Sequence, residues 1–249
     1  MIHFNNVLKS AIVTTIAAAG FFGATGAASA RVVNIDVEGY RTAGGGMNGT
    51  QDKTYIGSGA AGGGTVFNGV THLAVSDGSS SATTGDEQTL TGTNLNDSNG
   101  NPTSVDFTVG QVGLDTETAA PDTDAATLFN DYVFNHSAGN STNATFTLSD
   151  LQPGLTYDVY LYAGFANVGN LSNTTITGGT ATPFTASGVF NSGNTAHYTV
   201  VADIFGKING TMGSGTQILA GVTISYIPEP ASLSLLAVGG LALLRRRHA

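Results

Sequence analysis

The stretch LTYDVYLYAG, residues 155–164, decides the fold class of this chain. Apolar and polar side chains alternate along it, and in an extended backbone successive side chains point to opposite faces. One face of the stretch is therefore apolar and holds Leu155, Tyr157, Val159 and Leu161. A period of two is typical of a β-strand that packs one face against a core, so we predict a strand here.

Similar alternation recurs throughout residues 31–227. The other segments are RVVNIDVEGY (31–40), SVDFTVG (104–110), NATFTLSDL (143–151), HYTVVADIFGKINGTM (197–212) and TQILAGVTISYI (216–227). Asn-Gly, Asp-Gly and Gly-Gly pairs punctuate them, and no run between them has a convincing helical period. We therefore expect an all-β body that forms a single antiparallel, jelly-roll-like β-sandwich. Within it, residues 76–124 are expected to be loop-rich, with only a strand around Phe107 to anchor them.

Composition and charge exclude several classes of function. The 249 residues include 35 glycines but no cysteine and no tryptophan. Between residues 31 and 227 there are four basic and sixteen acidic residues, a net charge of −12. Such a body would be repelled by phosphate backbones, so no nucleic acid partner is expected. The absence of cysteine excludes disulfides, thiolate metal sites and a cysteine nucleophile.

The first thirty residues have the layout of a secretory signal peptide. Lys9 provides a positive charge, residues 11–23 are apolar, and Ala28 and Ala30 are the small residues that a signal peptidase inspects. We expect an N-terminal signal-peptide helix over residues 1–30, with cleavage after Ala30.

The other end of the chain has a second apolar segment, residues 231–244. As a helix it would be about 21 Å long, against a hydrocarbon core of about 30 Å, so it is a short transmembrane helix. Arg245, Arg246 and Arg247 follow it and are expected to stay on the cytoplasmic side. The body then lies on the side of the membrane opposite the cytoplasm, which is also where the signal peptide would deliver it.

Pro228, Glu229 and Pro230 stand immediately before this apolar segment. The order of Pro-Glu-Pro, apolar helix and arginines resembles the PEP-CTERM sorting signal, a tail also labelled an ice-binding-protein C-terminal domain. The resemblance covers residues 227–249 and implies that an exosortase, a membrane-embedded cysteine transpeptidase or protease, recognises and removes the tail. It further implies that the body is anchored in the inner membrane before processing and then reaches the cell surface or the extracellular matrix.

The body offers one candidate ligand platform. The segment LSDLQPGLTYDVYLYAGF (148–165), followed later by HYTVVADIFGKINGTM (197–212) and a closing strand, resembles galactose-binding-like β-sandwiches. Its Leu-Gln-Pro-Gly turn followed by Tyr157 is explained by core packing and a tight turn. Tyr160 and Tyr162 share the polar face of that strand, where aromatic rings could stack on sugar rings. The alternative is that a second layer covers both rings.

Other motifs predict no catalytic residues and no metal site. GSGAAG (57–62) matches a dinucleotide fingerprint but lacks the helix that the motif requires, so we interpret it as a flexible loop. Asp97, Asn99 and Asn101 are spaced like the start of a calcium loop, but Pro102 stands where that loop needs glycine; a structural Ca²⁺ elsewhere in the sandwich stays open. His72, His136 and His197 lack zinc-ligand spacing.

We therefore expect three parts: a signal peptide (1–30), a β-sandwich body (31–227) and a sorting and anchor segment (228–249). The first functional hypothesis is a non-catalytic bacterial surface or matrix protein associated with exopolysaccharide and biofilm. Its partners would be signal peptidase and exosortase. The alternative is a surface carbohydrate-binding module. A remote alternative is a secreted polysaccharide hydrolase that uses an acid pair such as Asp86 and Glu87.

Overall fold

A computed structural model of the chain describes ten stretches of its sequence. These are residues 31–38, 55–61, 64–71, 88–116, 128–129, 131–135, 144–163, 171–182, 194–213 and 217–226. The chain divides into two units, one of residues 31–226 and one of residues 1–30 together with 227–249, and all the described residues belong to the first. Every named element among them is a β-strand, so the described part is all-β.

Six strands of this part form the first sheet, here called sheet A. In order across the sheet they are β2 (Phe67–Thr71), β1 (Arg31–Glu38), β13 (Gly221–Tyr226), β7 (Thr156–Tyr162), β10 (Thr195–Val201) and β9 (Thr180–Thr182). Pairing is antiparallel except between β1 and β2, which run parallel. The expectation of a wholly antiparallel sandwich is therefore wrong at this edge. A parallel pair needs a long connection, and residues 39–66 supply it.

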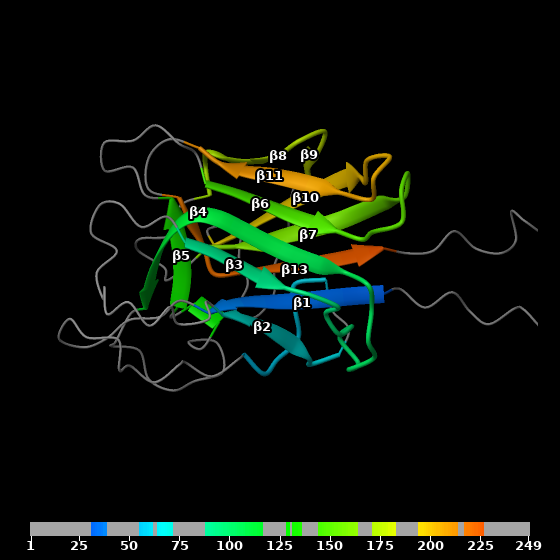
Figure 1. Cartoon of the computed structure of the whole chain (residues 1–249), viewed down its shortest axis with the longest axis horizontal. Coiled ribbons are helices and arrows are strands. Elements are labelled where there is room, and N and C mark those ends of the chain that lie inside the picture. Colours follow the sequence, from blue (N-terminus) through cyan, green and yellow to red (C-terminus); the bar gives the residue numbers. More distant parts are fainter. Residues whose placement is uncertain are drawn as a thin grey trace, which may run out of the picture. The chain divides into compact units, whose positions relative to one another are not determined.

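Seven strands form the second sheet, sheet B (Figure 1). Along its main path they are β12 (Ile218–Leu219), β5 (Asp131–Asn135), β4 (Asp106–Thr116), β6 (Ala144–Ser149), β11 (Ile208–Met212) and β8 (Thr174–Ile176), and β3 (Gln88–Gly92) pairs with β4. Both β3 and β4 lie in the segment expected to be loop-rich. The expected strand around Phe107 is present as part of β4, and β3 is an additional strand.

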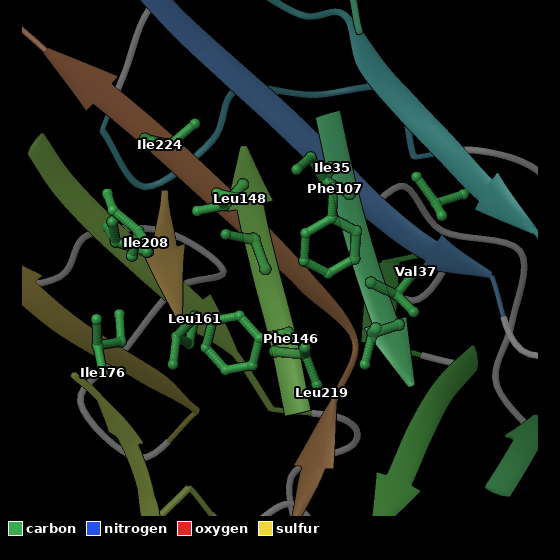
Figure 2. Close-up of a cluster of buried hydrophobic side chains, with 14 of the residues drawn as sticks. Ile35, Val37, Phe107, Phe146, Leu148, Leu161, Ile176, Ile208, Leu219 and Ile224 are labelled. Atoms are coloured by element: carbon green, nitrogen blue, oxygen red, sulfur yellow. The ribbon is translucent and has the colours of Figure 1, made fainter. Parts of the chain in front are cut away.

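The main hydrophobic core combines side chains from both sheets (Figure 2). Val159 and Leu161 of β7 are fully buried, as are Phe107 of β4 and Leu148 of β6. The apolar face read from the period-two pattern is thus the core face, and that prediction is confirmed. An interior built from two facing sheets is the arrangement of a β-sandwich.

Two neighbouring connections carry the chain from one sheet to the other at the same end of the body. Residues 150–155 link β6 to β7, and residues 202–207 link β10 to β11. The amide of Leu151 donates to the carbonyl of Gly206 (3.1 Å), and the amide of Gly154 donates to the carbonyl of Ala202 (3.0 Å). The two connections therefore pair with each other through their backbones.

The first connection also has a side-chain anchor. The amide of Gln152 donates to the hydroxyl of Tyr157 at 2.9 Å, in the manner of the tyrosine corner of other β-sandwiches. Leu151 and Tyr157 are both buried, and Gly154 has a positive φ of 76°. Core packing and a tight turn thus explain this part of the sequence, as predicted.

Both ends of the described body meet in the middle of sheet A. Arg31, the first residue of β1, is the register partner of Tyr226, the last residue of β13. The chain therefore enters and leaves this unit at the end that carries the two connections, as Figure 1 shows.

Gly206 is the position where a small change should disrupt the paired connections. It has a φ of +69°, and an added Cβ would lie 2.3 Å from the carbonyl oxygen of Leu151. We predict that Gly206→Ala lowers the free energy of unfolding by about 3 kcal/mol, because a strained φ is combined with a backbone clash. Chemical denaturation measures this value.

Gly154→Ala is the matched control. Gly154 has a similar φ of +76°, but an added Cβ would meet no atom within 4 Å. Gly154→Ala should lower the free energy of unfolding by only about 1 kcal/mol, because only the left-handed backbone conformation is unfavourable there. Equal losses in the two variants would contradict the role given to the Gly206–Leu151 contact.

Candidate functional site

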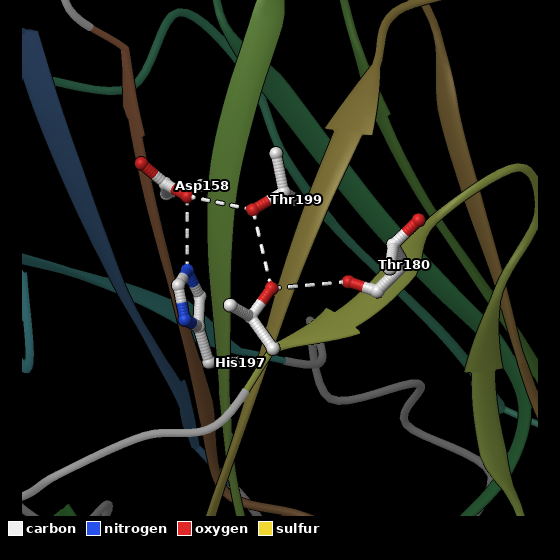
Figure 3. Close-up of polar contacts among 5 residues, drawn as sticks. Asp158, Thr180, His197 and Thr199 are labelled. Atoms are coloured by element: carbon white, nitrogen blue, oxygen red, sulfur yellow. Dashed lines mark hydrogen bonds and ion pairs between the residues drawn. The ribbon is translucent and has the colours of Figure 1, made fainter.

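A strip of polar and aromatic side chains lies on the face of sheet A opposite the main core, and Figure 3 shows its polar contacts. Its centre is His197 of β10, the register partner of Tyr160 of β7. Nε2 of His197 lies 2.9 Å from Oδ1 of Asp158, and the His197 ring stacks on the Tyr160 ring with 4.3 Å between centroids and 3° between planes. We call Asp158, Tyr160, His197 and the threonines described next the β7–β10 strip.

Threonines extend this strip toward the edge strand β9. Thr199 donates from Oγ1 to Oδ1 of Asp158 at 3.1 Å. The hydroxyls of Thr199 and Thr182 are 3.2 Å apart, and Thr182 donates to the backbone carbonyl of Thr180. The Asp158 carboxylate thus accepts from both its neighbours on β10, which fixes its orientation.

The strip combines a partly exposed aromatic ring with hydrogen-bonding oxygens. The Tyr160 ring stacks on His197 on one side and also packs against the buried cluster that includes Tyr55 and Tyr162, so only part of it faces solvent. The Asp158 side chain is 43% exposed, whereas that of His197 is 12% exposed. Burial, followed by the negative charge of Asp158, raises the pKa of Tyr160, so its hydroxyl stays a neutral donor and acceptor at physiological pH. A partly exposed aromatic ring beside polar groups is chemistry that suits contact with a sugar.

Tyr162, the second residue of the predicted platform, is fully buried. Its hydroxyl lies 2.5 Å from Oγ1 of Thr223 and accepts from the amide of Ala60 at 2.8 Å. Thr223 in turn donates to Oδ1 of Asn34 at 2.7 Å. The ring is therefore covered in this structure, and Tyr160 is the platform residue that remains partly exposed.

The segment that covers Tyr162 includes part of the glycine motif GSGAAG. A Cβ on Gly59 would lie 2.3 Å from Oδ1 of Asn34 and 2.7 Å from Oγ1 of Thr223. Glycine therefore lets this segment approach the polar face of sheet A closely. Residues 55–61 contain no helix or strand, so the motif lies in a loop, as expected, and the contacts of Gly59 and Ala60 with sheet A give it a structural role.

The candidate calcium loop is closed by its own hydrogen bonds. Oδ1 of Asp97 accepts from the amides of Asn99 and Asn101, both at 2.9 Å, and the Asn101 side chain donates to both carboxylate oxygens. Burial acts to raise the pKa of Asp97, but the hydrogen bonds from Asn101 and Asn99 outweigh it and hold the pKa below its usual value. Asp97 thus organises a tight turn. Among the residues that the structure describes, no cluster of three or more His, Asp or Glu side chains could hold a metal ion.

A cleft of about 180 Å³ opens at the end where the chain enters and leaves the body. Arg31 and Tyr226 line it, together with Asp150 and Gln152 of the first connection and Tyr157 of β7. It is small beside ordinary ligand pockets, which measure about 300–1,000 Å³.

Several predicted site residues lie outside the described stretches. They are Ala28, Ala30, Pro228, Glu229, Pro230, Arg245, Arg246 and Arg247, and the acid pair Asp86 and Glu87 lies outside as well. Within the described stretches, no helix is long and apolar enough to span a membrane.

The Asp158–His197 pair was not predicted from the sequence. The two residues are 39 positions apart and meet only because β7 and β10 pair in one particular register. A one-residue slip would send one of them to the opposite face, so sequence spacing carries no signal for this pair.

We predict that the free energy of unfolding decreases at alkaline pH because of the buried Tyr162. Burial raises its pKa well above the ordinary value near 10, although the hydrogen bonds with Thr223 and Ala60 oppose the shift. Because the folded pKa is above the unfolded one, the stabilisation is complete below pH 10 and is lost as the pH rises further, by up to about 1.4 kcal/mol per pH unit. Urea unfolding at several pH values measures this slope.

The Tyr162→Phe variant should flatten the alkaline slope. It should also lose about 1–2 kcal/mol at pH 7, because Ala60 and Thr223 lose a buried partner. Tyr160→Phe is the control, since its half-buried hydroxyl should contribute less. An unchanged slope in Tyr162→Phe would assign the alkaline transition to another group.

Comparison of the chain with protein-family models, curated proteins and solved structures found no match.

Proposed function

We propose that this chain is an exported bacterial protein of the cell surface or extracellular matrix, sorted through its C-terminal tail by an exosortase. The observation that carries the proposal is the order of Pro228-Glu229-Pro230, the apolar segment 231–244 and the three arginines. The signal-peptide layout of residues 1–30 supports it, because it provides the export step that such a tail requires.

The geometry of the body is compatible with removal of both ends. The described strand pairs lie between Arg31 and Tyr226, so cleavage after Ala30 and beyond Tyr226 would leave each of these pairs intact. The chain also leaves the body beside the point where it enters, so both cuts fall at the same end.

We further propose that the body is a jelly-roll-like β-sandwich flanked by terminal helices before processing, and that its role is non-catalytic. A net charge of −12 keeps residues 31–227 soluble and disfavours adsorption to anionic surfaces. These properties suit a protein that works among hydrated polysaccharides, with exopolysaccharide as its expected environment.

The second candidate function is carbohydrate binding by the β7–β10 strip. The stack of Tyr160 on His197, with Asp158 and Thr199 beside it, favours this alternative. The strip would hold a sugar ring against the exposed part of Tyr160 and accept its hydroxyl protons at Asp158.

Mass spectrometry of the protein recovered from cells that carry an exosortase tests the sorting proposal. We expect a mature N-terminus at Arg31 and a C-terminus near Glu229, with the body recovered outside the inner membrane. Glu229→Ala should leave the tail attached and keep most of the protein in the membrane fraction. His248→Ala is the control, because it changes the tail outside the motif. Efficient processing of Glu229→Ala, or an intact Met1-to-Ala249 chain in the cytosol, would contradict the proposal.

Glycan-array screening followed by calorimetry tests the alternative. Loss of the stacking ring in Tyr160→Ala should weaken binding of any sugar ligand by about fivefold or more, since an aromatic stack contributes about 1 kcal/mol or more. Tyr198→Phe is the control, because Tyr198 packs against the main core from the opposite face of β10. Binding that survives Tyr160→Ala would place the ligand elsewhere.

A further inference from the structure

The turn between β10 and β11 presents two adjacent large apolar side chains to solvent. Ile204 is 81% exposed and Phe205 is 75% exposed, the highest values among the large hydrophobic residues of the described part. Val201, just before the turn, is 55% exposed. A contiguous apolar tip of this kind is unfavourable in water and marks a contact surface.

The backbone holds this tip in an outward position. Oδ1 of Asp203 accepts from the amides of Phe205 (2.9 Å) and Lys207 (2.8 Å). Asp203 and Lys207 also pair through their backbones, and Gly206 is bonded to Leu151 of the neighbouring connection. Folding Ile204 and Phe205 back onto the body would break these hydrogen bonds.

The tip lies at the end of the body where the chain enters and leaves. Val201 pairs with Thr156 at the start of β7, and β13 ends beside the same end of β7, where Tyr226 pairs with Arg31. In Figure 1 the connection between β10 and β11 and the free ends of β1 and β13 lie on the same side of the body.

The sequence places this end close to any membrane in which the tail is anchored. Residues 227–230 separate Tyr226 from the apolar segment that begins at Ala231. Four extended residues span at most about 14 Å. The headgroup region occupies part of that distance, since it adds about 5–8 Å to each side of the hydrocarbon core. A turn at this end of the body is therefore within reach of the lipid.

Charge does not oppose this contact. The exposed charged residues described around the tip and the chain entry are Arg31, Lys207, Asp150 and Asp203, which together are neutral. Asp97, Asp106 and Asp158 near this end add negative charge, but a zwitterionic lipid surface has no net charge that would repel them.

We propose that Ile204 and Phe205 form a membrane-contacting tip that inserts into the interfacial region of the lipid bilayer while the tail is attached. This inference rests on the proposed function, because the tail must anchor the chain. Tethering raises the effective concentration of the tip at the lipid surface, so two side chains suffice for a contact that a free body would make only weakly. The contact holds the body in one orientation, with its processing segment at the membrane.

The absence of natural tryptophan gives a direct test. The full chain with Phe205→Trp carries one tryptophan, and it is reconstituted through its tail into phosphatidylcholine vesicles with brominated acyl chains. We expect blue-shifted emission and at least about twofold stronger quenching than for the control, because interfacial side chains reach about 5–10 Å into the headgroup and acyl boundary. Ile204→Trp is a second reporter at the same tip.

Ile56→Trp is the matched control. Ile56 is 71% exposed, and its neighbour Tyr55 is bonded to Asp36, five residues along β1 from Arg31. It therefore lies about 17 Å from the tip end, measured along that strand. Its tryptophan should emit as in water and should not be quenched.

Flotation of the vesicles distinguishes anchoring by the tail from lipid contact by Ile204 and Phe205. Protein that floats with unquenched tryptophan at positions 204 and 205 would overturn the membrane tip and leave the anchored tail intact. Protein that does not float would overturn the anchor and, with it, the tip. A blue shift in membranes that contain exosortase, but not in lipid vesicles, would identify a protein partner and overturn the lipid contact.

Discussion

The antiparallel pairing of the first strand with the last is the constraint on which the rest of the body depends. It runs from Arg31–Tyr226 to Asp36–Gly221 and places both ends of the described body in the interior of sheet A. An interior strand is bonded on both sides, so β1 and β13 cannot separate without breaking the sheet into two parts. The segments at the two ends of the sequence are therefore attached to the most strongly held part of the sheet.

The polar side of β1 shows how this pairing is reinforced. Asn34 and Asp36 point away from the main core, yet both are fully buried, because residues 55–61 cover them. Thr223 of β13 and Tyr162 of β7 complete the network with Asn34 across three adjacent strands. Buried polar groups stabilise a fold only when they are satisfied, so this network selects one register for these strands. The cost of ordering the cover is offset by a second hydrophobic cluster that includes Tyr55, Phe67 and Tyr162.

The sequence predicts what depends on local periodicity and misses what depends on a distant partner. The core positions of β7, such as Val159 and Leu161, follow from alternation alone. Alternation puts Tyr160 and Tyr162 on one face but cannot show that residues 55–61 cover one ring and not the other. The parallel strand β2 is not predicted for the same reason, since its pairing with β1 follows a connection of 28 residues. The strand β3, which pairs with β4, is not predicted because the sequence around it is acidic and polar. The Asp158–His197 pair depends on the register of β7 with β10, which no spacing in the chain encodes.

The two proposed surfaces lie on different parts of the body, and this bears on how they could act together. Tyr160 is four residues along β7 from Thr156, about 13 Å from the end that carries Ile204 and Phe205. Its side chain also lies on the face of sheet A opposite the main core, whereas Ile204 and Phe205 lie in the turn at the end of the strands. A body that rests on the bilayer by its tip would therefore keep the β7–β10 strip away from the lipid and open to the surrounding medium. Because the tip is attached to β10, the same strand that carries His197, the orientation of the strip relative to the membrane would follow from the fold. Membrane contact and polysaccharide contact are thus compatible in one anchored molecule, and loss of the tail would free the body without altering the strip.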